Sequence, residues 1–246
     1  MIKHAIILAG GQGTRLRPVT LETPKPLVTV QGTPIATWLL CLFARHGVEE
    51  VTVIYPTVWK NRFEEWGEGV PRTTYRVPRI RLHEEKEPMG TMGALVHEVD
   101  LGDAPVFVTN GDELKGLDLG QLAQFHETQK TTDLDHGATI ALVRVPNPSE
   151  YGVAEMEGDR IIRFHEKPAI PPSTLISSGL YVIEPSVLSA ARRDAATSRF
   201  MMLEKDLFPG LAEGRRLAGC QLEGQWYDCG TLERWEKAIK EWKGLA

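Results

Sequence analysis

The first thirty residues constrain the fold more than any other stretch of the chain. The apolar run Ile6–Ala9 is typical of a buried strand, and it leads directly into a glycine-rich turn, Gly10–Gly13. Glycines let the backbone approach a ligand closely and aim several N–H groups at one point, which suits phosphate oxygens. Arg15, Arg17 and Lys25 add positive charge nearby. The stretch therefore predicts a strand and turn that bind the triphosphate of a nucleotide.

This glycine turn does not match the two best-known phosphate loops. Its glycines lack the G-x-G-x-x-G spacing, and Lys25 lies too far along the chain for a Walker A loop. On its own, the turn is also compatible with a plain tight turn beside solvated arginines. Lys25 favours the phosphate interpretation, because Pro24 and Pro26 fix the backbone on both sides of it and so direct one cation at a ligand.

Composition limits the partners of the chain. The 246 residues are 42% hydrophobic and 25% charged, which is ordinary for a globular protein with a sizeable core. A formal net charge of −5 argues against bulk binding of nucleic acid or an anionic membrane. Three cysteines without C-x-x-C spacing argue against zinc and a disulfide framework. No segment predicts a leader peptide or a membrane span, so we expect a cytoplasmic protein.

Strands and helices alternate along the first part of the chain. This alternation indicates a Rossmann-like, three-layer α/β/α fold with a mixed, mostly parallel sheet covered on both faces. Ligands of such sheets lie at the carboxyl ends of the strands, where the glycine turn and Asp112 both fall. The strand-like runs are 4–9, 51–55, 106–109 and 138–145, and the clearest helical patterns follow Thr33-Pro34 and cover 118–130.

The pattern changes beyond Pro146. Two strand-like runs flank Glu157-Gly158-Asp159 and predict an inserted β-hairpin. Because no linker or repeat is visible, we predict one domain over 1–246, with halves of about 1–145 and about 146–246. Apolar positions on a predicted last helix, 231–243, leave a homodimer open.

Two aspartates are candidate metal ligands. Asp112 and Asp228 each follow a strand-like run and stand in a turn beside glycine. Each alone is compatible with an ordinary turn residue. Carboxylates at the ends of two strands can share one Mg²⁺, which prefers hard oxygen ligands, and a triphosphate turn makes this the better interpretation.

Glu166-Lys167-Pro168 is a third constellation. A lysine held beside proline could bind a second phosphate, and the glutamate before it could accept hydrogen bonds from hydroxyl groups. A surface ion pair in a turn is the alternative.

Nine segments together resemble, in order, the signature segments of the sugar-1-phosphate nucleotidyltransferases, or NDP-sugar pyrophosphorylases. Within that family the chain is most similar to mannose-1-phosphate guanylyltransferase-like members, in a short form without the left-handed β-helix that some relatives append. The segments span about 4–235 and are LAGGQGTRLRPVT, TPKPLVTV, EKEPMGTMGAL, VTNGDEL, YGVAE, FHEKP, SSGLYVI, LEKDLFPGLA and WYDCGT.

The resemblance implies an enzyme in which a sugar 1-phosphate attacks the α-phosphorus of a nucleoside triphosphate, giving an NDP-sugar and pyrophosphate. It implies that Arg15 neutralises the leaving pyrophosphate, that Lys25 holds a phosphate at the reacting centre, and that Asp112 and Asp228 hold Mg²⁺. The nucleotide-binding residues that it implies are Leu8, Gly10, Gly11, Gly13, Thr14, Glu85 and Gly90. Those on the sugar-phosphate side are Gly152, Glu166, Lys167 and Ser178, with Lys167 on the phosphate and Glu166 on sugar hydroxyls.

Glu85 bears on the choice of base. Relatives that transfer thymidylyl or uridylyl groups often carry glutamine there, which can both donate and accept. A carboxylate only accepts, which suits N1–H and N2–H₂ of guanine. We therefore favour GTP with mannose 1-phosphate or a related sugar. A glucose-1-phosphate thymidylyl- or uridylyltransferase, or a uridylyltransferase for hexosamine or N-acetylmuramate 1-phosphate, stays open, and Ser178 stands where the family commonly has asparagine.

Functions of other classes are less favoured. A non-catalytic regulatory paralogue would bind nucleotide without turnover, but Arg15, Lys25, Asp112, Lys167 and Asp228 are all present. A cytidylyltransferase acting on phosphocholine would share the N-terminal half, whereas YGVAE and FHEKP favour a sugar. A dinucleotide-dependent dehydrogenase would need a glycine fingerprint that this turn lacks.

Overall fold

The computed structural model describes residues 1–11, 13–70, 77–97, 99–100, 102–194 and 200–245. Its contacts divide the chain into two compact units: unit 1 is 1–88, 109–117 and 224–246, and unit 2 is 89–108 and 118–223. These divisions differ from the predicted boundary near residue 145. The reason is that β7 (Glu113–Leu117) pairs with β13 (Gly224–Asp228), so a middle segment and the C-terminal segment both belong to unit 1.

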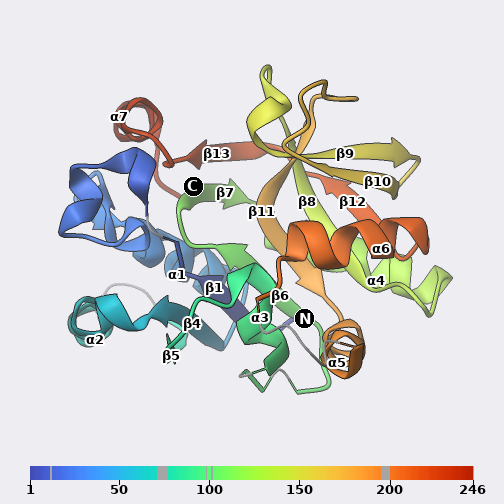
Figure 1. The fold of residues 1–246 in the computed structure, drawn as a ribbon, viewed down its shortest axis with the longest axis horizontal. Coiled ribbons are helices and arrows are strands. Elements are labelled where there is room, and N and C mark those ends of the chain that lie inside the picture. Colours follow the sequence, from blue (N-terminus) through green and yellow to red (C-terminus); the bar gives the residue numbers. More distant parts are fainter. Residues whose placement is uncertain (12, 71–76, 98, 101, 195–199, 246) are drawn as a thin grey trace. The chain divides into compact units, whose positions relative to one another are not determined.

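Three parallel strands form the sheet of unit 1, in the order β5-β4-β1 (Figure 1). They are β1 (His4–Leu8), β4 (Glu50–Pro56) and β5 (Arg79–Glu85). Ala5, Ile6 and Ile7 are fully buried, as expected for a strand covered on both faces. The predicted parallel pairing is confirmed here, and it brings the carboxyl ends of β1 and β5 to one edge.

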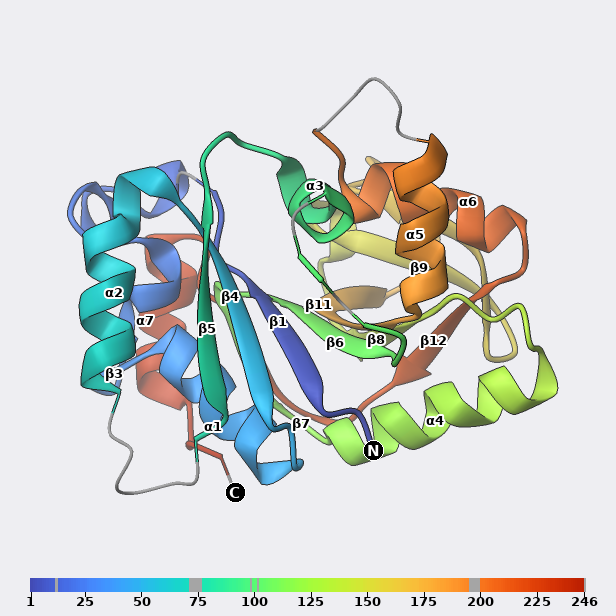
Figure 2. The same ribbon diagram turned by 90° about the horizontal axis from the view of Figure 1, so that it is seen from below.

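Helices pack around the strands of unit 1 (Figure 2). Phe63 of α2 stacks on Tyr55 of β4 at 4.8 Å between ring centroids, and Trp242 lies edge-on to Trp38 at 5.7 Å. Two-residue strands β2 (Thr29–Val30) and β3 (Thr33–Pro34) pair with each other. The packing partners are α1 (Ile35–Arg45) with β3 and β7, α2 (Lys60–Gly69) with β4 and β5, and α7 (Leu232–Glu241) with β2 and β13.

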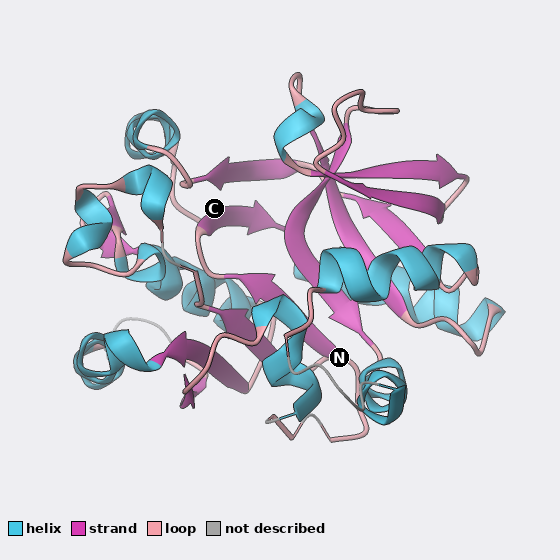
Figure 3. Cartoon of the chain, viewed as in Figure 1, coloured by secondary structure: helices cyan, strands magenta, loops and turns pink. Residues whose placement is uncertain are grey.

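The sheet of unit 2 has the order β6-β11-β8-β12-β10-β9 (Figure 1, Figure 3). β8 and β12 are parallel, whereas β8–β11, β9–β11, β9–β10 and β10–β12 are antiparallel. The mixed α/β fold is confirmed, and antiparallel pairing is frequent in this unit, which holds the predicted hairpin. The strands are β6 (Val106–Asn110), β8 (Ala138–Arg144), β9 (Gly152–Glu157), β10 (Arg160–Glu166), β11 (Leu175–Ile183) and β12 (Leu217–Gln221).

Helices cover both faces of this sheet. α4 (Leu119–Thr132) packs on one face, and α6 (Phe208–Glu213) packs on the other (Figure 2). α3 (Gly90–His97) packs on α5 (Pro185–Asp194). The predicted β-hairpin is confirmed, since β9 and β10 flank a turn in which Gly158 has φ 58°. Among the described residues no helix is long and apolar enough to cross a membrane.

A buried polar cluster ties α4 to the sheet of unit 2. His126 Nε2 lies 3.0 Å from the Glu184 carboxylate, and its Nδ1 lies 2.9 Å from Thr139 Oγ1. His136 Nε2 contacts the same hydroxyl at 2.9 Å. Because a carboxylate only accepts, we infer that His126 carries its proton on Nε2, that Thr139 donates to its Nδ1, and that His136 donates to Thr139. Both imidazoles are then neutral.

This cluster makes folding sensitive to acid. Burial lowers the pKa of His126, and burial together with His126 lowers the pKa of His136 to about 4. The unfolded chain therefore binds protons near pH 6.5 that the folded cluster does not accept, so stability is lost as the pH falls below that value. For His136 alone we expect a loss on the order of 1–2 kcal/mol between pH 7 and pH 5.

The test is urea unfolding of the wild type and His136→Gln at pH 7, 6 and 5. Glutamine keeps a donor toward Thr139 and removes the titration, so the free energy of unfolding of the variant should fall less steeply with pH. Parallel pH profiles for the two proteins would contradict the expectation.

Candidate active site

The glycine turn in unit 1 packs against the aliphatic part of the Lys25 side chain. Gly13 has φ 61° and precedes the short 3₁₀ turn η1 (Thr14–Leu16). A Cβ at this position would lie 2.9 Å from Thr20 Cγ2 and 3.2 Å from Lys25 Cγ, so only glycine fits. Thr20 Oγ1 also donates to the Gly13 carbonyl at 2.7 Å. The predicted pairing of this turn with Lys25 is therefore present in the structure.

Other predicted nucleotide-binding residues surround that turn. The Leu8 carbonyl at the end of β1 accepts a hydrogen bond from Gly111 N at 2.9 Å, which joins β1 to the turn that carries Asp112. Glu85, the last residue of β5, is 8% exposed, and its Oε2 lies 3.8 Å from the point where a Cβ of Gly10 would stand. The remaining members are exposed: Gly10, Gly11, Thr14 and Arg15.

Lys25 reaches Asp112 across 87 positions of sequence. Its Nζ lies 2.6 Å from Asp112 Oδ2. Lys25 opens the turn η3 (Lys25–Leu27) between Pro24 and Pro26, both of which are buried. Burial acts to raise the pKa of Asp112, but the charge and hydrogen bond of Lys25, with help from Lys115, lower it overall. Asp112 is therefore ionised at neutral pH.

The pairing of β7 with β13 brings Asp228 beside this site. Asp228 stands opposite Glu113 in the antiparallel register, and Cys229 N donates to the Asp112 carbonyl at 3.2 Å. The Asp228 Oδ2 atom accepts from Arg234 Nη1 at 2.6 Å. The two predicted carboxylates thus lie on adjacent turns of unit 1, and each is paired with a cation.

A buried ion pair behind these carboxylates is not predicted by the sequence analysis. The Lys115 side chain is wholly buried, with its Nζ 2.9 Å from Glu113 Oε2, and Trp226 Nε1 donates to the same oxygen at 3.2 Å. Burial raises the pKa of Glu113 to about 7; Lys115 opposes this shift, while Asp112 and Asp228 add to it. No local pattern marks Lys115, because its burial depends on β13, more than a hundred residues away.

These residues fit a magnesium ion by their donor chemistry. Among the described residues no group of three or more His, Cys, Asp or Glu side chains is arranged to hold a metal. Mg²⁺ usually takes only one or two carboxylates, with waters and substrate phosphates completing its shell. The hard oxygens of Asp112 and Asp228 match that donor set.

Unit 2 gathers most of the residues predicted for the sugar phosphate. Glu166 at the end of β10 stands opposite Gly152 at the start of β9. A Cβ on Gly152 would lie 2.4 Å from the Phe164 ring, so glycine is required. Lys167 has φ 48°, its N–H donates to the Tyr151 carbonyl at 3.1 Å, and its Nζ lies 3.1 Å from Glu166 Oε1. The Lys167 side chain is 59% exposed, so this ammonium is accessible.

Two further predicted residues have mainly structural contacts. Ser178 is fully buried, and its Oγ donates to the Ala141 carbonyl at 2.8 Å. Gly90, also in unit 2, has φ 74°, and a Cβ there would lie 2.3 Å from the Met201 carbonyl oxygen. Gly90 therefore allows the segment before α3 to cross closely over 201–202.

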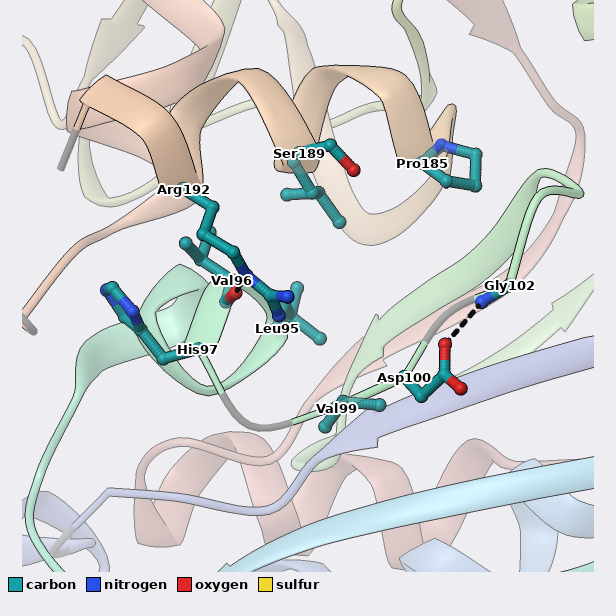
Figure 4. Close-up of a pocket in the computed structure, with 10 residues that line it drawn as sticks. Leu95, Val96, His97, Val99, Asp100, Gly102, Pro185, Ser189 and Arg192 are labelled. Carbon is teal, nitrogen blue, oxygen red and sulfur yellow. Dashed lines mark hydrogen bonds between the residues drawn. The ribbon is translucent and has the colours of Figure 1, made fainter.

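A separate pocket of about 290 Å³ lies between α3 and α5 (Figure 4). Arg192 extends from α5 and donates to the Val96 carbonyl, while Asp100 accepts from Gly102 N at 3.1 Å (Figure 4). None of the predicted site residues lines this pocket.

The chain is similar in sequence to proteins of known name. The chain is 36% identical over 233 residues to the mannose-1-phosphate guanylyltransferase catalytic subunit beta of Xenopus tropicalis, and 36% identical over 236 residues to the mannose-1-phosphate guanylyltransferase of Mycobacterium tuberculosis. These alignments cover 92% and 93% of this chain but only 61% of each relative, so the chain spans about three fifths of their length.

Solved structures support the fold. A UDP-glucose pyrophosphorylase complexed with UDP-glucose matches with a TM-score of 0.80 at 21% identity over 97% of both chains, and an apo UDP-glucose pyrophosphorylase matches with 0.77 at 20% identity. The model of the family described as nucleotidyl transferase matches residues 4–243. Since that match runs over nearly the whole sequence, the chain belongs to the nucleotidyl transferase family.

Proposed function

We propose that the chain transfers a guanylyl group from GTP to mannose 1-phosphate or a closely related sugar 1-phosphate, giving GDP-mannose or a related GDP-sugar and pyrophosphate. The observation that carries the proposal is the Lys25–Asp112 contact beside the glycine turn, with Asp228 on the adjacent turn. The names of the relatives support guanine and mannose. We expect the reaction in the cytoplasm, without nucleic-acid or membrane partners, and a homodimer stays a prediction.

Unit 1 would bind the triphosphate. The turn with exposed Gly10 and Gly11 and half-buried Gly13 would offer backbone N–H groups to phosphate oxygens. Arg15 would neutralise charge on the leaving pyrophosphate, and Lys25 would turn its ammonium to a phosphate at the reacting centre. A phosphate oxygen of the sugar 1-phosphate forms a bond to the α-phosphorus, and the bond from that phosphorus to the bridging oxygen breaks. Pyrophosphate leaves with the electron pair.

Asp112 and Asp228 would hold Mg²⁺. The bound ion would neutralise phosphate charge and fix the α-phosphate in place. The residues themselves orient the site, because the paired strands β7 and β13 hold both carboxylates on adjacent turns.

Unit 2 would bind the sugar 1-phosphate. The positive φ of Lys167 and its backbone bond to Tyr151 hold an accessible ammonium beside Glu166. We assign Lys167 to the phosphate of this substrate and Glu166 to sugar hydroxyls. Gly152 keeps the opposing backbone of β9 close to Glu166.

Removing either metal-binding carboxylate should stop the reaction. Asp112→Asn keeps the shape and an acceptor for Lys25 but loses the charge, so we expect kcat to fall at least about 100-fold. Asp228→Asn should do the same. Pyrophosphate release is followed with GTP and mannose 1-phosphate, and melting temperatures check the fold.

Asp103→Asn, the same change on an exposed aspartate, is the matched control. The wild type is assayed against GTP, ATP, UTP, CTP and dTTP with several hexose 1-phosphates. No turnover anywhere in this panel would overturn the proposal, and GTP binding without turnover would favour the regulatory paralogue.

Glu85 should determine the base. Its carboxylate lies near Gly10 and can accept both donors on the guanine edge, whereas glutamine would present a donor to one of them. For Glu85→Gln we expect kcat/KM for GTP to fall about 10- to 100-fold, with a rise in the UTP-to-GTP ratio.

Glu84→Gln is the matched control, because the Glu84 carboxylate contacts Lys60 and Thr57 instead. An unchanged base preference in Glu85→Gln would remove the guanine assignment, while leaving the rest of the mechanism intact.

A further inference from the structure

Glu204 is a partly buried carboxylate in unit 2 to which the proposed mechanism gives no role. It lies in the π-helical turn η6 (Leu203–Leu207), in the segment LEKDLFPGLA. Thr91 Oγ1 donates to Glu204 Oε2 at 2.7 Å, and Tyr181 Oη donates to Oε1 at 3.5 Å. A carboxylate can accept about four hydrogen bonds, so Oε1 has capacity for closer donors. Short π-helical turns inside helices are frequent at functional sites.

The framework of unit 2 holds this carboxylate in place. Thr91 Oγ1 accepts from Leu203 N at 2.9 Å while it donates to Glu204, which closes a small ring of hydrogen bonds. One turn further on, Phe208 packs against Phe164 of β10 at 5.3 Å and Tyr181 of β11 at 4.9 Å between ring centroids. The orientation of Glu204 is thus set by contacts with β10, β11 and the start of α3.

The turn η6 that carries Glu204 packs on β10, the strand that ends at Glu166, so this carboxylate lies on the side of unit 2 proposed to bind the sugar phosphate. Burial raises the pKa of Glu204, the Glu166 carboxylate raises it further, and the Lys167 ammonium opposes both. Tyr181, which donates to Glu204, itself accepts from Ser177 Oγ at 3.3 Å. Hydrogen-bond donors therefore converge on Glu204 from within the protein, and Glu166 and Lys167 are charged groups in its neighbourhood.

A purely structural role does not explain why residue 204 is a charged glutamate. To fasten the segment 89–92 through Thr91, a neutral acceptor would suffice, and a partly buried carboxylate near Glu166 is disfavoured by both desolvation and repulsion. Sugar hydroxyls are donors that a fixed carboxylate binds well. Resting on the proposed function, we propose that Glu204 accepts hydrogen bonds from ring hydroxyls of the sugar 1-phosphate and is a further residue that determines sugar specificity.

The variant Glu204→Gln tests this assignment. Glutamine keeps an oxygen for Thr91, so the melting temperature should not change, whereas charge-assisted bonds to the sugar are lost. We expect KM for mannose 1-phosphate to rise at least about tenfold, with KM for GTP within about twofold of wild type. Independently of turnover, the affinity for GDP-mannose should fall while the affinity for GDP stays unchanged.

Deoxy sugar 1-phosphates, each lacking one ring hydroxyl, identify the contact. The analogue without the contacted hydroxyl should bind wild type and Glu204→Gln equally, since the interaction is absent in both. Thr91→Val is the control for a structural role: it removes the fastening bond but keeps the carboxylate, so it should lower the melting temperature and change KM for the sugar much less than Glu204→Gln does.

The outcomes separate the two proposals. If the wild type turns over and Glu204→Gln keeps its sugar KM, or both variants change both KM values alike, Glu204 is structural and only this inference is overturned. If the wild type neither turns over nor binds GDP-mannose more tightly than GDP, the proposed function is overturned and the sugar assignment of Glu204 with it.

Discussion

The ion pair between Lys25 and Asp112 is the interaction on which the nucleotide side of this protein depends. The Lys25 and Asp112 side chains are 12% and 31% exposed, so both charges are partly withdrawn from water. Removing either partner would leave the other charge partly buried and unpaired, which would destabilise the fold. The pair forms only because three segments meet: the glycine turn packs on the Lys25 stem, two prolines hold the lysine, and Gly111 bonds back to β1. Substrate phosphates would compete with Asp112 for the same ammonium, which makes this pair a prepared site as well as a structural link.

The paired strands β7 and β13 add the second candidate metal ligand, Asp228, to the site of the Lys25–Asp112 ion pair. Antiparallel pairing places Glu113 opposite Asp228, and it closes over Lys115, a wholly buried lysine that joins Glu113. Asp112, Glu113 and Asp228 would repel one another strongly if left alone. Lys25, Lys115 and Arg234 lie against them one for one, so the carboxylates can be held close together before any metal or substrate arrives.

The features that could be predicted from the sequence are those with a local pattern of residues. Glycines, prolines and charges within thirty residues predicted the Lys25 turn, the hairpin at Gly158 has its own turn signal, and alternating elements predicted the α/β fold. No local pattern predicts the roles of Lys115 and Glu204, because their burial and their hydrogen-bond partners come from β13 and α3, which are distant in sequence. The register between distant strands, such as β8 and β11, carries no local signal either, since it depends on packing. The assignment of Ser178 comes from its position in a motif, and no local pattern predicted the bond from its hydroxyl to the Ala141 carbonyl.

The two units are proposed to bind different ligands, and the charges of their candidate sites differ accordingly. Unit 1 pairs each carboxylate of its site with a cation, as suits a place that must accept a dication and a polyanion together without a large change in net charge. In the part of unit 2 that the structure describes, Glu166 and Glu204 both neighbour the Lys167 ammonium, so acceptors outnumber cations there. That excess suits a ligand with one phosphate and several hydroxyl donors. Charge balance thus distinguishes the proposed site for a metal and a triphosphate from the proposed site for a sugar phosphate, although both are built from the same residue types.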